Sequence, residues 1–289
     1  MRLLVLGAAG QLGGDLMTAA AAAGVEAAGA TRAEVDVADL PRLRAFLEGQ
    51  DFDALVNCAA RLDTEAIEGD PAPALAVNGH APAVMAEVAA AKGARMIQVS
   101  TDYVFGGDTG RATPLTEADP TAPVNVYGLT KAFGETLARL GGGDVSVFRV
   151  ASTFGVRGAA GKGGNFVETM IRMGTERGAL KVVADQVMSP TSTAWAAQAI
   201  LAFLARGGAP GVYHAVNTGA VSWFEFARAI VAKAGVAAEV SPVSASEWPS
   251  KARRPAYSAL DNARLAGVIG PIPGWAEALD AYLAAKGHV

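Results

Sequence analysis

Thr101, Tyr127 and Lys131 have the types and spacing of side chains that could assist the reduction of a carbonyl group. Tyr127 and Lys131 are four residues apart, so on a helix they share a face and the ammonium can lie beside the phenol. A free phenol has a pKa near 10, but a nearby cation favours the phenolate. We therefore expect Lys131 to lower the pKa of Tyr127, which could then pass a proton to a carbonyl oxygen.

The Tyr127–Lys131 pair alone is weak evidence for catalysis, because an ordinary amphipathic helix can place a tyrosine four residues before a lysine by chance. The apolar run at residues 95–99 predicts a buried strand that ends in Ser100 and Thr101. Hydroxyls at that place lie at the carboxyl edge of a sheet, where open α/β folds bind ligands. The joint occurrence of these features favours catalysis over an ordinary helix pair.

A glycine-rich turn follows the first predicted strand, Leu3–Leu6, and precedes an alanine-rich helix that Gly24 can end. The turn, residues 7–13, reads GAAGQLG. Glycines let backbone approach a pyrophosphate, and the start of a helix offers unpaired N–H groups to its oxygens. A purely structural turn is the alternative, but the position directly after a strand favours dinucleotide binding.

The end of the second predicted strand bears on the choice of cofactor. This strand, residues 25–30, is followed by Thr31 and Arg32, where NAD-selective proteins often have an acid for the adenosine ribose. Arg32 could instead face the 2′-phosphate of NADPH, or be an ordinary solvated arginine. Asp36 is a candidate adenine contact, with a loop cap as the alternative.

Further strands and helices alternate along the first half of the chain. Asp39 should cap a helix, residues 53–57 predict a third strand, and a long helix is expected over residues 71–92. Asn78 in that helix would be costly in a core unless it is hydrogen-bonded, so we expect it near the catalytic lysine. With another strand at residues 145–149, the βαβαβ succession predicts a parallel sheet.

The predicted fold class is α/β, a Rossmann-type doubly wound parallel sheet with a smaller, loop-rich substrate-binding domain. Residues 1–149 are expected to form the dinucleotide-binding domain, completed by segments within 193–220 and 274–289. Residues 150–192 and 221–273 are expected to form the substrate-binding region, in which Ser222 and Glu225 have the spacing of a capping box that opens a helix. In the latter, Arg253 and Arg254 precede a proline and could clamp a diphosphate, with a surface turn as the alternative.

Composition limits the classes of function. The chain has 289 residues, 51% of them hydrophobic, and can bury a large core. Its net charge of −4, without a basic run, argues against nucleic acid and anionic membranes as partners. The single cysteine, Cys58, excludes an internal disulfide, and three scattered histidines predict no metal site. The apolar run at the start of the sequence is too short for the core of a signal peptide, so a cytoplasmic location is expected.

With these residues in hand, the chain resembles the extended short-chain dehydrogenase/reductases, and among them the dTDP-4-dehydrorhamnose reductase family. The shared strings run nearly from end to end: GAAGQLG at 7–13, VSTDYVFGG at 99–107, PVNVYGLTK at 123–131, GGNF at 163–166, DQVMSPTS at 185–192 and ARRPAYSALD at 252–261. The resemblance implies reduction of the 4-keto group of a dTDP-4-dehydro-6-deoxy-sugar, with dTDP-4-dehydrorhamnose and dTDP-rhamnose as the expected substrate and product. NADPH is the expected cofactor, and acceptance of NADH stays open.

The resemblance also assigns roles to residues. Thr101, Tyr127 and Lys131 fall on the family's catalytic positions. The expected cofactor-binding residues are Gly7, Gly10, Gln11, Leu12, Gly13, Arg32, Asp36, Val37, Ala59, Ala60 and Asn78, together with Tyr127 and Lys131. The expected substrate-binding residues are Thr101, Asp102, Tyr103, Val104, Tyr127, Ser152, Asn165, Arg253 and Arg254. A homodimer is the candidate assembly.

Two stretches depart from the family's pattern. Relatives usually have Thr-Ser-Trp after the arginine at position 149, whereas this chain has Val150, Ala151 and Ser152. Residues 61–65, Arg-Leu-Asp-Thr-Glu, replace a polar and acidic pattern. The reaction class survives these changes better than the exact sugar does. Two alternatives stay open: a non-catalytic NADP-binding regulatory subunit, and another NDP-sugar epimerase or dehydratase.

Overall fold

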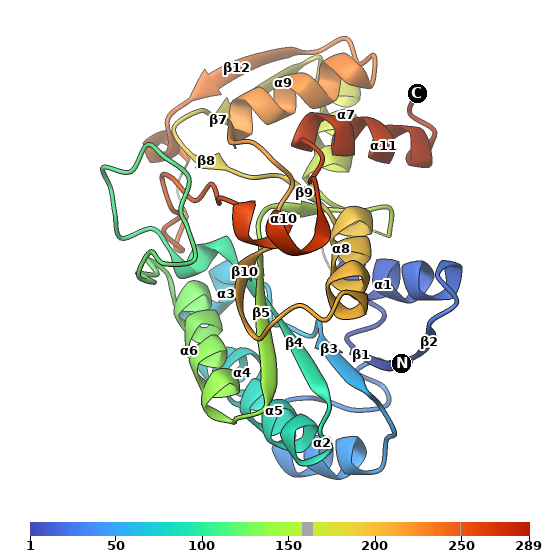
Figure 1. Cartoon of the computed structure of the whole chain (residues 1–289). Coiled ribbons are helices and arrows are strands. Elements are labelled where there is room, and N and C mark those ends of the chain that lie inside the picture. Colours follow the sequence, from blue (N-terminus) through green and yellow to red (C-terminus); the bar gives the residue numbers. More distant parts are fainter. Residues whose placement is uncertain (158–163, 249) are drawn as a thin grey trace.

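A twisted parallel sheet organises the larger part of the molecule (Figure 1). The computed structural model describes residues 1–157, 164–248 and 250–289. The six strands lie in the order β10-β5-β4-β3-β1-β2, and every pair is parallel. Their bounds are β1 (Arg2–Leu6), β2 (Glu26–Ala30), β3 (Ala54–Asn57), β4 (Arg95–Thr101), β5 (Asp144–Val150) and β10 (Gly211–His214). The order reverses between β1 and β3, and open α/β sheets bind ligands outside the strand ends at such a point.

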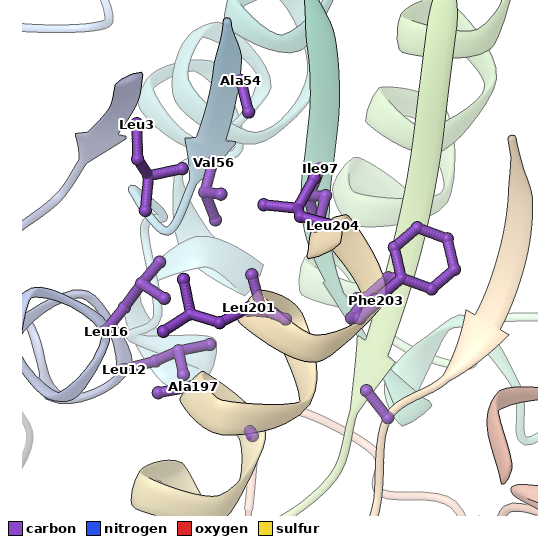
Figure 2. Close-up of a cluster of buried hydrophobic side chains, with 14 of the residues drawn as sticks. Leu3, Leu12, Leu16, Ala54, Val56, Ile97, Ala197, Leu201, Phe203 and Leu204 are labelled. Carbon is purple, nitrogen blue, oxygen red and sulfur yellow. The ribbon is translucent and has the colours of Figure 1, made fainter. Parts of the chain in front are cut away.

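Helices cover both faces of this sheet. One face packs against α1 (Gln11–Ala22), α8 (Thr193–Ala205) and α10 (Ala263–Ile269), and the other packs against α2 (Leu40–Glu48), α5 (Ala81–Ala91) and α6 (Val126–Leu140). Figure 2 shows the first of these cores, in which Leu12 and Leu16 of α1 and Leu201 of α8 meet Val56 and Ile97 of the strands. The fold class predicted from the sequence is confirmed.

Local signals in the sequence account for where several helices begin. Asp39 accepts a hydrogen bond from Arg42 N and begins α2, with Pro41 in the first turn. Ser222 and Glu225 form the predicted capping box of α9 (Trp223–Lys233). The helix expected over residues 71–92 consists of α4 (Ala72–Ala74), the π-helical turn η1 (Leu75–His80) and α5. A π-helical turn inside a helix is frequent at functional sites.

A smaller lobe lies beyond the carboxyl edge of the sheet (Figure 1). It holds the parallel pair β7 (Ala179–Val183) and β12 (Glu239–Val243) and the helices α7 (Phe166–Arg177), α9 and α11 (Trp275–Lys286). The remaining short elements of the whole molecule are α3 (Thr64–Gly69), η2 (Asp102–Val104), β6 (Thr153–Phe154), β8 (Val187–Met188), β9 (Thr191–Ser192), β11 (Val221–Ser222) and η3 (Ala245–Glu247). No helix in the described part of the chain is long and apolar enough to cross a bilayer.

The packing corrects two parts of the expected division of the chain. Helix α11 was expected to complete the sheet-bearing unit, but Leu279, Tyr282 and Leu283 lie in the core of the smaller lobe, with Phe226 of α9. Conversely, α10 was expected in the substrate-binding region, and its Leu265 lies in the core under the sheet. Both errors have one reason: an amphipathic helix pattern shows that a face is buried, but not against which partner. Residues 158–163 of the expected substrate region, including Gly163 of the GGNF string, lie outside the described residues.

Candidate active site

A pocket of about 790 Å³ opens at the carboxyl ends of β1, β3 and β4 and reaches the smaller lobe. This volume is within the usual range for ligand sites. Most residues expected from the sequence line it: Gly7, Gly10, Gln11, Leu12, Gly13, Arg32, Asp36, Val37, Ala59, Ala60, Thr101, Asp102, Tyr103, Tyr127, Lys131, Ser152, Asn165 and Arg254. Asn78, Val104 and Arg253 are not among the lining residues. Among the described residues, no three His, Cys, Asp or Glu side chains gather as metal ligands.

The glycine-rich turn has the shape of a phosphate cradle. Gly7 has a φ of +76°, and a Cβ there would collide with the backbone of Cys58 and Ala59 at the end of β3. A Cβ on Gly13 would collide with the backbone of Gly7, so the turn can pack against α1 only with glycine at both positions. Gly10 precedes α1 and offers no side-chain cap, which leaves the first N–H groups of the helix for a ligand. These features fit the pyrophosphate of a dinucleotide.

The adenosine end of the pocket carries a cation next to an acid. Arg32 is exposed, and its guanidinium lies 2.9 Å from the Asp36 carboxylate. Asp36 also accepts a hydrogen bond from Ala38 N, and this bond lowers the pKa of its carboxyl group. Asp36 therefore caps this loop, which is the alternative to an adenine contact. Arg32 is free to turn toward a phosphate, since an exposed ion pair is worth little.

A close approach of backbone brings Tyr127 to Thr101. Thr101 ends β4, and its Oγ1 accepts a hydrogen bond of 3.2 Å from Tyr103 N. Asn125 caps α6 by accepting from Gly128 N at 2.7 Å, which sets Tyr127 in the first turn. Gly128 lies directly against Tyr103 O, where any Cβ would collide. The sequence VYG therefore seats the start of α6 on η2, beside the end of β4.

The electrostatics of Tyr127 differ from expectation. Burial is the main cause that raises the pKa of Tyr127 well above its ordinary value; a hydrogen bond with Thr101 acts against it, and the charges of Asp102 and Tyr103 raise it further. Lys131 was expected to lower this pKa. Its Nζ instead donates to Val99 O at 2.7 Å, so the expectation is wrong for this arrangement. The four-residue spacing placed both groups on one face, but it did not show that a strand carbonyl competes for the ammonium.

Lys131 itself is strongly perturbed. Burial lowers its pKa to about 8, and the charges of Glu135 and Cys58 oppose this effect. Burial also raises the pKa of the nearby Cys58 thiol to about 12, so this cysteine is a neutral part of the pocket wall. Lys131 can therefore be a cation at neutral pH while it loses its proton more readily than a surface lysine.

Asn78 supports the pocket from behind. Its Oδ1 accepts from Arg61 N at 2.8 Å, and its Nδ2 donates to Arg61 O at 3.0 Å and to Thr130 Oγ1 at 3.1 Å. Asn78 therefore lies near the catalytic lysine, as expected, and joins the loop after β3 to Thr130, the residue before the lysine. A buried amide in a π-helical turn has few local partners, which explains why it bonds to two distant segments.

The substrate side of the pocket also needs correction. Val104 is fully buried in a core with Phe105, because η2 turns its side chain inward. The Arg253 side chain is exposed and its carbonyl accepts from Asn125 Nδ2, so of the two arginines Arg254 lines the pocket. Asn165 caps α7 by accepting from Glu168 N and donates to Gly155 O, with part of its side chain toward the pocket.

Three features of the site were not foreseen from the sequence. Glu65 of α3 accepts hydrogen bonds from Ser250 Oγ and Lys251 N, which joins the sheet-bearing part to the segment that carries Arg254. Trp223 of the smaller lobe lines the pocket. Beneath Lys131, Glu135 and Arg149 form a buried ion pair. Glu135 follows Lys131 by four residues, a spacing that could have drawn attention to it.

Comparison with known proteins then identifies the family. A family model described as the RmlD substrate binding domain matches residues 1–287. The chain belongs to this family. A relative from Mycolicibacterium smegmatis, named dTDP-4-dehydrorhamnose reductase, is 39% identical over 98% of this chain and 85% of its own length. A relative of the same name from Burkholderia thailandensis is 38% identical over 95% of each chain.

Solved structures of RmlD-like proteins match the fold over nearly the whole chain. A dTDP-4-dehydrorhamnose reductase from Clostridium acetobutylicum superposes with a TM-score of 0.92 at 32% identity, covering 99% of this chain and 100% of that one. A dTDP-4-dehydrorhamnose reductase from Bacillus anthracis in complex with NADP gives 0.91 at 31% identity, covering 98% and 99%. Other curated relatives act on different sugars by name, such as a dTDP-4-keto-6-deoxy-D-glucose reductase from Streptomyces niveus at 36% identity.

Proposed function

We propose that the protein reduces the 4-keto group of a dTDP-4-dehydro-6-deoxy-sugar with NADPH, and that dTDP-4-dehydrorhamnose is converted to dTDP-rhamnose. Membership of the RmlD family and the names of full-length relatives support the reaction. The observation that carries the proposal for this chain is the meeting of Thr101, Tyr127 and Lys131 in one pocket with the glycine-rich turn. A regulatory subunit that only bound NADP would have no need of this group.

The glycine-rich turn and the start of α1 would hold the pyrophosphate of the cofactor, and Lys131 would reach the hydroxyls of its nicotinamide ribose. When bound, NADPH supplies the hydride. Tyr127 gives the proton to the carbonyl oxygen, and burial suits this task because the raised pKa keeps the phenol protonated when the sugar arrives. Thr101 would hold the Tyr127 phenol in place by the hydrogen bond between them.

The remaining contacts follow from charge and position. Arg254 would bind the diphosphate of the sugar nucleotide, since a guanidinium fork matches phosphate oxygens. Arg32 would face the 2′-phosphate of NADPH, in keeping with the Bacillus anthracis relative in complex with NADP. A cytoplasmic location and a homodimer stay predictions.

The test is turnover. Protein and NADPH are mixed with dTDP-4-dehydrorhamnose, cofactor oxidation is followed, and the product is identified by NMR. Tyr127→Phe should lower kcat by about 10²–10⁴-fold with unchanged NADPH binding, the usual span for a positioned acid. Tyr257→Phe, at a tyrosine outside this pocket, is the matched control and should keep the parent rate. NADPH binding without turnover on any 4-keto sugar nucleotide would instead support the regulatory alternative.

A further inference from the structure

A buried carboxyl group lies next to the reacting hydroxyls and bonds to two side chains from distant parts of the chain. Asp102 is 2% exposed and lines the pocket between Thr101 and Tyr103. Its Oδ1 accepts from Thr101 Oγ1 at 3.1 Å, and its Oδ2 accepts from Ser258 Oγ at 2.6 Å. Both carboxylate oxygens are therefore held, one by the residue that faces the substrate and one by a serine of the segment after Arg254.

Ser258 is itself held in place by a hydrogen bond of its backbone. It is 3% exposed, and its N–H donates to Val187 O at 2.8 Å beside a parallel bridge between Val187 and Tyr257. Two residues further on, Leu260 N donates to Ser189 Oγ at 3.2 Å. The Ser258 hydroxyl thus extends from a rigid segment, and it can hold a partner in one orientation with little loss of side-chain freedom.

The direction of the Thr101 hydroxyl depends on this partner. The Thr101 hydroxyl gives its one proton to Asp102, its oxygen accepts from Tyr103 N, and it also shares a hydrogen bond with the Tyr127 phenol. If the Asp102 carboxyl rotated, the proton of Thr101 would lose its acceptor and the Thr101 hydroxyl could turn away from the Tyr127 phenol. Ser258, on the other carboxylate oxygen, opposes that rotation.

We propose that Ser258 is a positioning residue for the reduction, because it fixes the Asp102 carboxyl and through it the Thr101 hydroxyl beside the Tyr127 phenol. The inference rests on the proposed function. The segment 254–258 then serves the site twice: Arg254 lines the pocket, and Ser258 orients the hydroxyl next to the proton donor.

The surroundings of Asp102 define a second readout. Burial raises the pKa of this carboxyl to about 6, and the hydrogen bonds from Ser258 and Thr101 lower it. The other titratable groups that interact with it are Tyr103, whose pKa burial raises to about 12, and Tyr127, whose pKa is raised further. Among these three groups, Asp102 is therefore the one that titrates near pH 6, and loss of the Ser258 bond should move its titration to higher pH.

The experiment is a double-mutant cycle with Ser258→Ala, Asp102→Ala and the double variant, each assayed with NADPH and dTDP-4-dehydrorhamnose. Ser258→Ala should lower kcat by about 10- to 100-fold, the scale of one hydrogen bond to a charged group, with KM for the sugar nucleotide within about twofold. In the Asp102→Ala background the same substitution should cost nothing further, because Ser258 acts through the carboxyl. The acidic limb of the kcat/KM profile should shift to higher pH in Ser258→Ala.

Two controls separate positioning from structure. Ser189→Ala removes the other serine bond to this segment, and Ser146→Ala removes a buried hydroxyl that has no hydrogen-bond partner. Both should keep the parent kcat and pH profile. Equal losses from Ser258→Ala in both backgrounds, a parent-like kcat, or an equal loss from Ser189→Ala would overturn the inference. A parent protein without any turnover would instead reject the proposed function.

Discussion

The buried ion pair between Glu135 and Arg149, beneath the site, is expected to contribute strongly to the stability of the fold. The Glu135 and Arg149 side chains are 6% and 5% exposed, with 2.7 Å between Arg149 Nη2 and Glu135 Oε2. Ser100 Oγ also donates to Glu135, and the Arg149 guanidinium lies 4.9 Å from the centre of the Phe105 ring. Glu135→Gln keeps the size of the side chain and one acceptor, but it leaves the Arg149 charge buried without a counter-charge.

Removing one partner of a buried pair typically costs about 3–5 kcal/mol, and the retained amide acceptor places this change at the lower end, about 3 kcal/mol. Unfolding entropy is about 2.1 cal/mol/K per residue, which over 289 residues gives about 0.6 kcal/mol/K. The expected fall in Tm is therefore about 5 °C. Calorimetry measures it directly, and urea titration gives the free energy of unfolding.

The matched control is Glu176→Gln, which breaks the exposed pair Arg172–Glu176, with side chains 61% and 53% exposed. Its expected cost is below about 0.5 kcal/mol. In a second test, Glu135→Leu with Arg149→Met removes both charges and should be more stable than Glu135→Leu alone, because no unpaired charge remains. A Glu135→Gln protein within 1 °C of the parent, or a double variant less stable than the single one, would refute this account of the pair.

Three further predictions concern the pocket. Arg32→Ala should weaken NADPH binding more than NADH binding, because Arg32 is expected to meet the 2′-phosphate; equal losses in fluorescence titrations of the two cofactors would contradict this. Ser152→Trp should change the ratios of kcat/KM across a panel of 4-keto sugars by about 10–200-fold, since Ser152 lines the pocket at a position where the family's pattern predicts a tryptophan; an unchanged ranking would show that Ser152 does not set selectivity. Asp102→Asn should raise the free energy of unfolding relative to the parent above pH 6 and not below pH 4. The pKa of Asp102 is about 6 in the folded protein, against an ordinary value of 3.8. The parent is therefore most stable when Asp102 is protonated, and it loses that contribution as pH rises through 6. The parent and variant are compared by Tm at pH 4 and pH 7, and a constant difference would contradict the raised pKa.

The sequence predicts those parts of the fold that depend on neighbours along the chain. Asp39 and Ser222 cap their helices as expected, because the bonded N–H groups lie only three residues away. Gly7 and Gly13 of the turn could be placed because each excludes a Cβ at a backbone contact. Thr101, Tyr127 and Lys131 were brought together correctly because a strand end and a helix face both have fixed directions.

Predictions failed where a side chain chooses among distant partners. Lys131 bonds to Val99 O and not to Tyr127, and the bonds of Asn78 to Arg61 and of Asp102 to Ser258, which is 156 residues away, were not predicted at all. No local pattern distinguishes these acceptors from others at the same edge of the sheet. The place of α11 failed for the same reason, since its apolar face would suit either core.

The place of α11 in the smaller lobe has a consequence for how the chain is made. The last strand of the sheet, β10, ends at His214, whereas the second core needs Leu283. At about 5–20 residues per second, synthesis from residue 215 to residue 283 takes roughly 3–14 s. During that interval the sheet can assemble on the ribosome while Phe154, Val167 and Phe226 still wait for their partners on α11. The apolar surface that later closes over the sugar side of the molecule is thus covered last, after α10 has completed the core under the sheet.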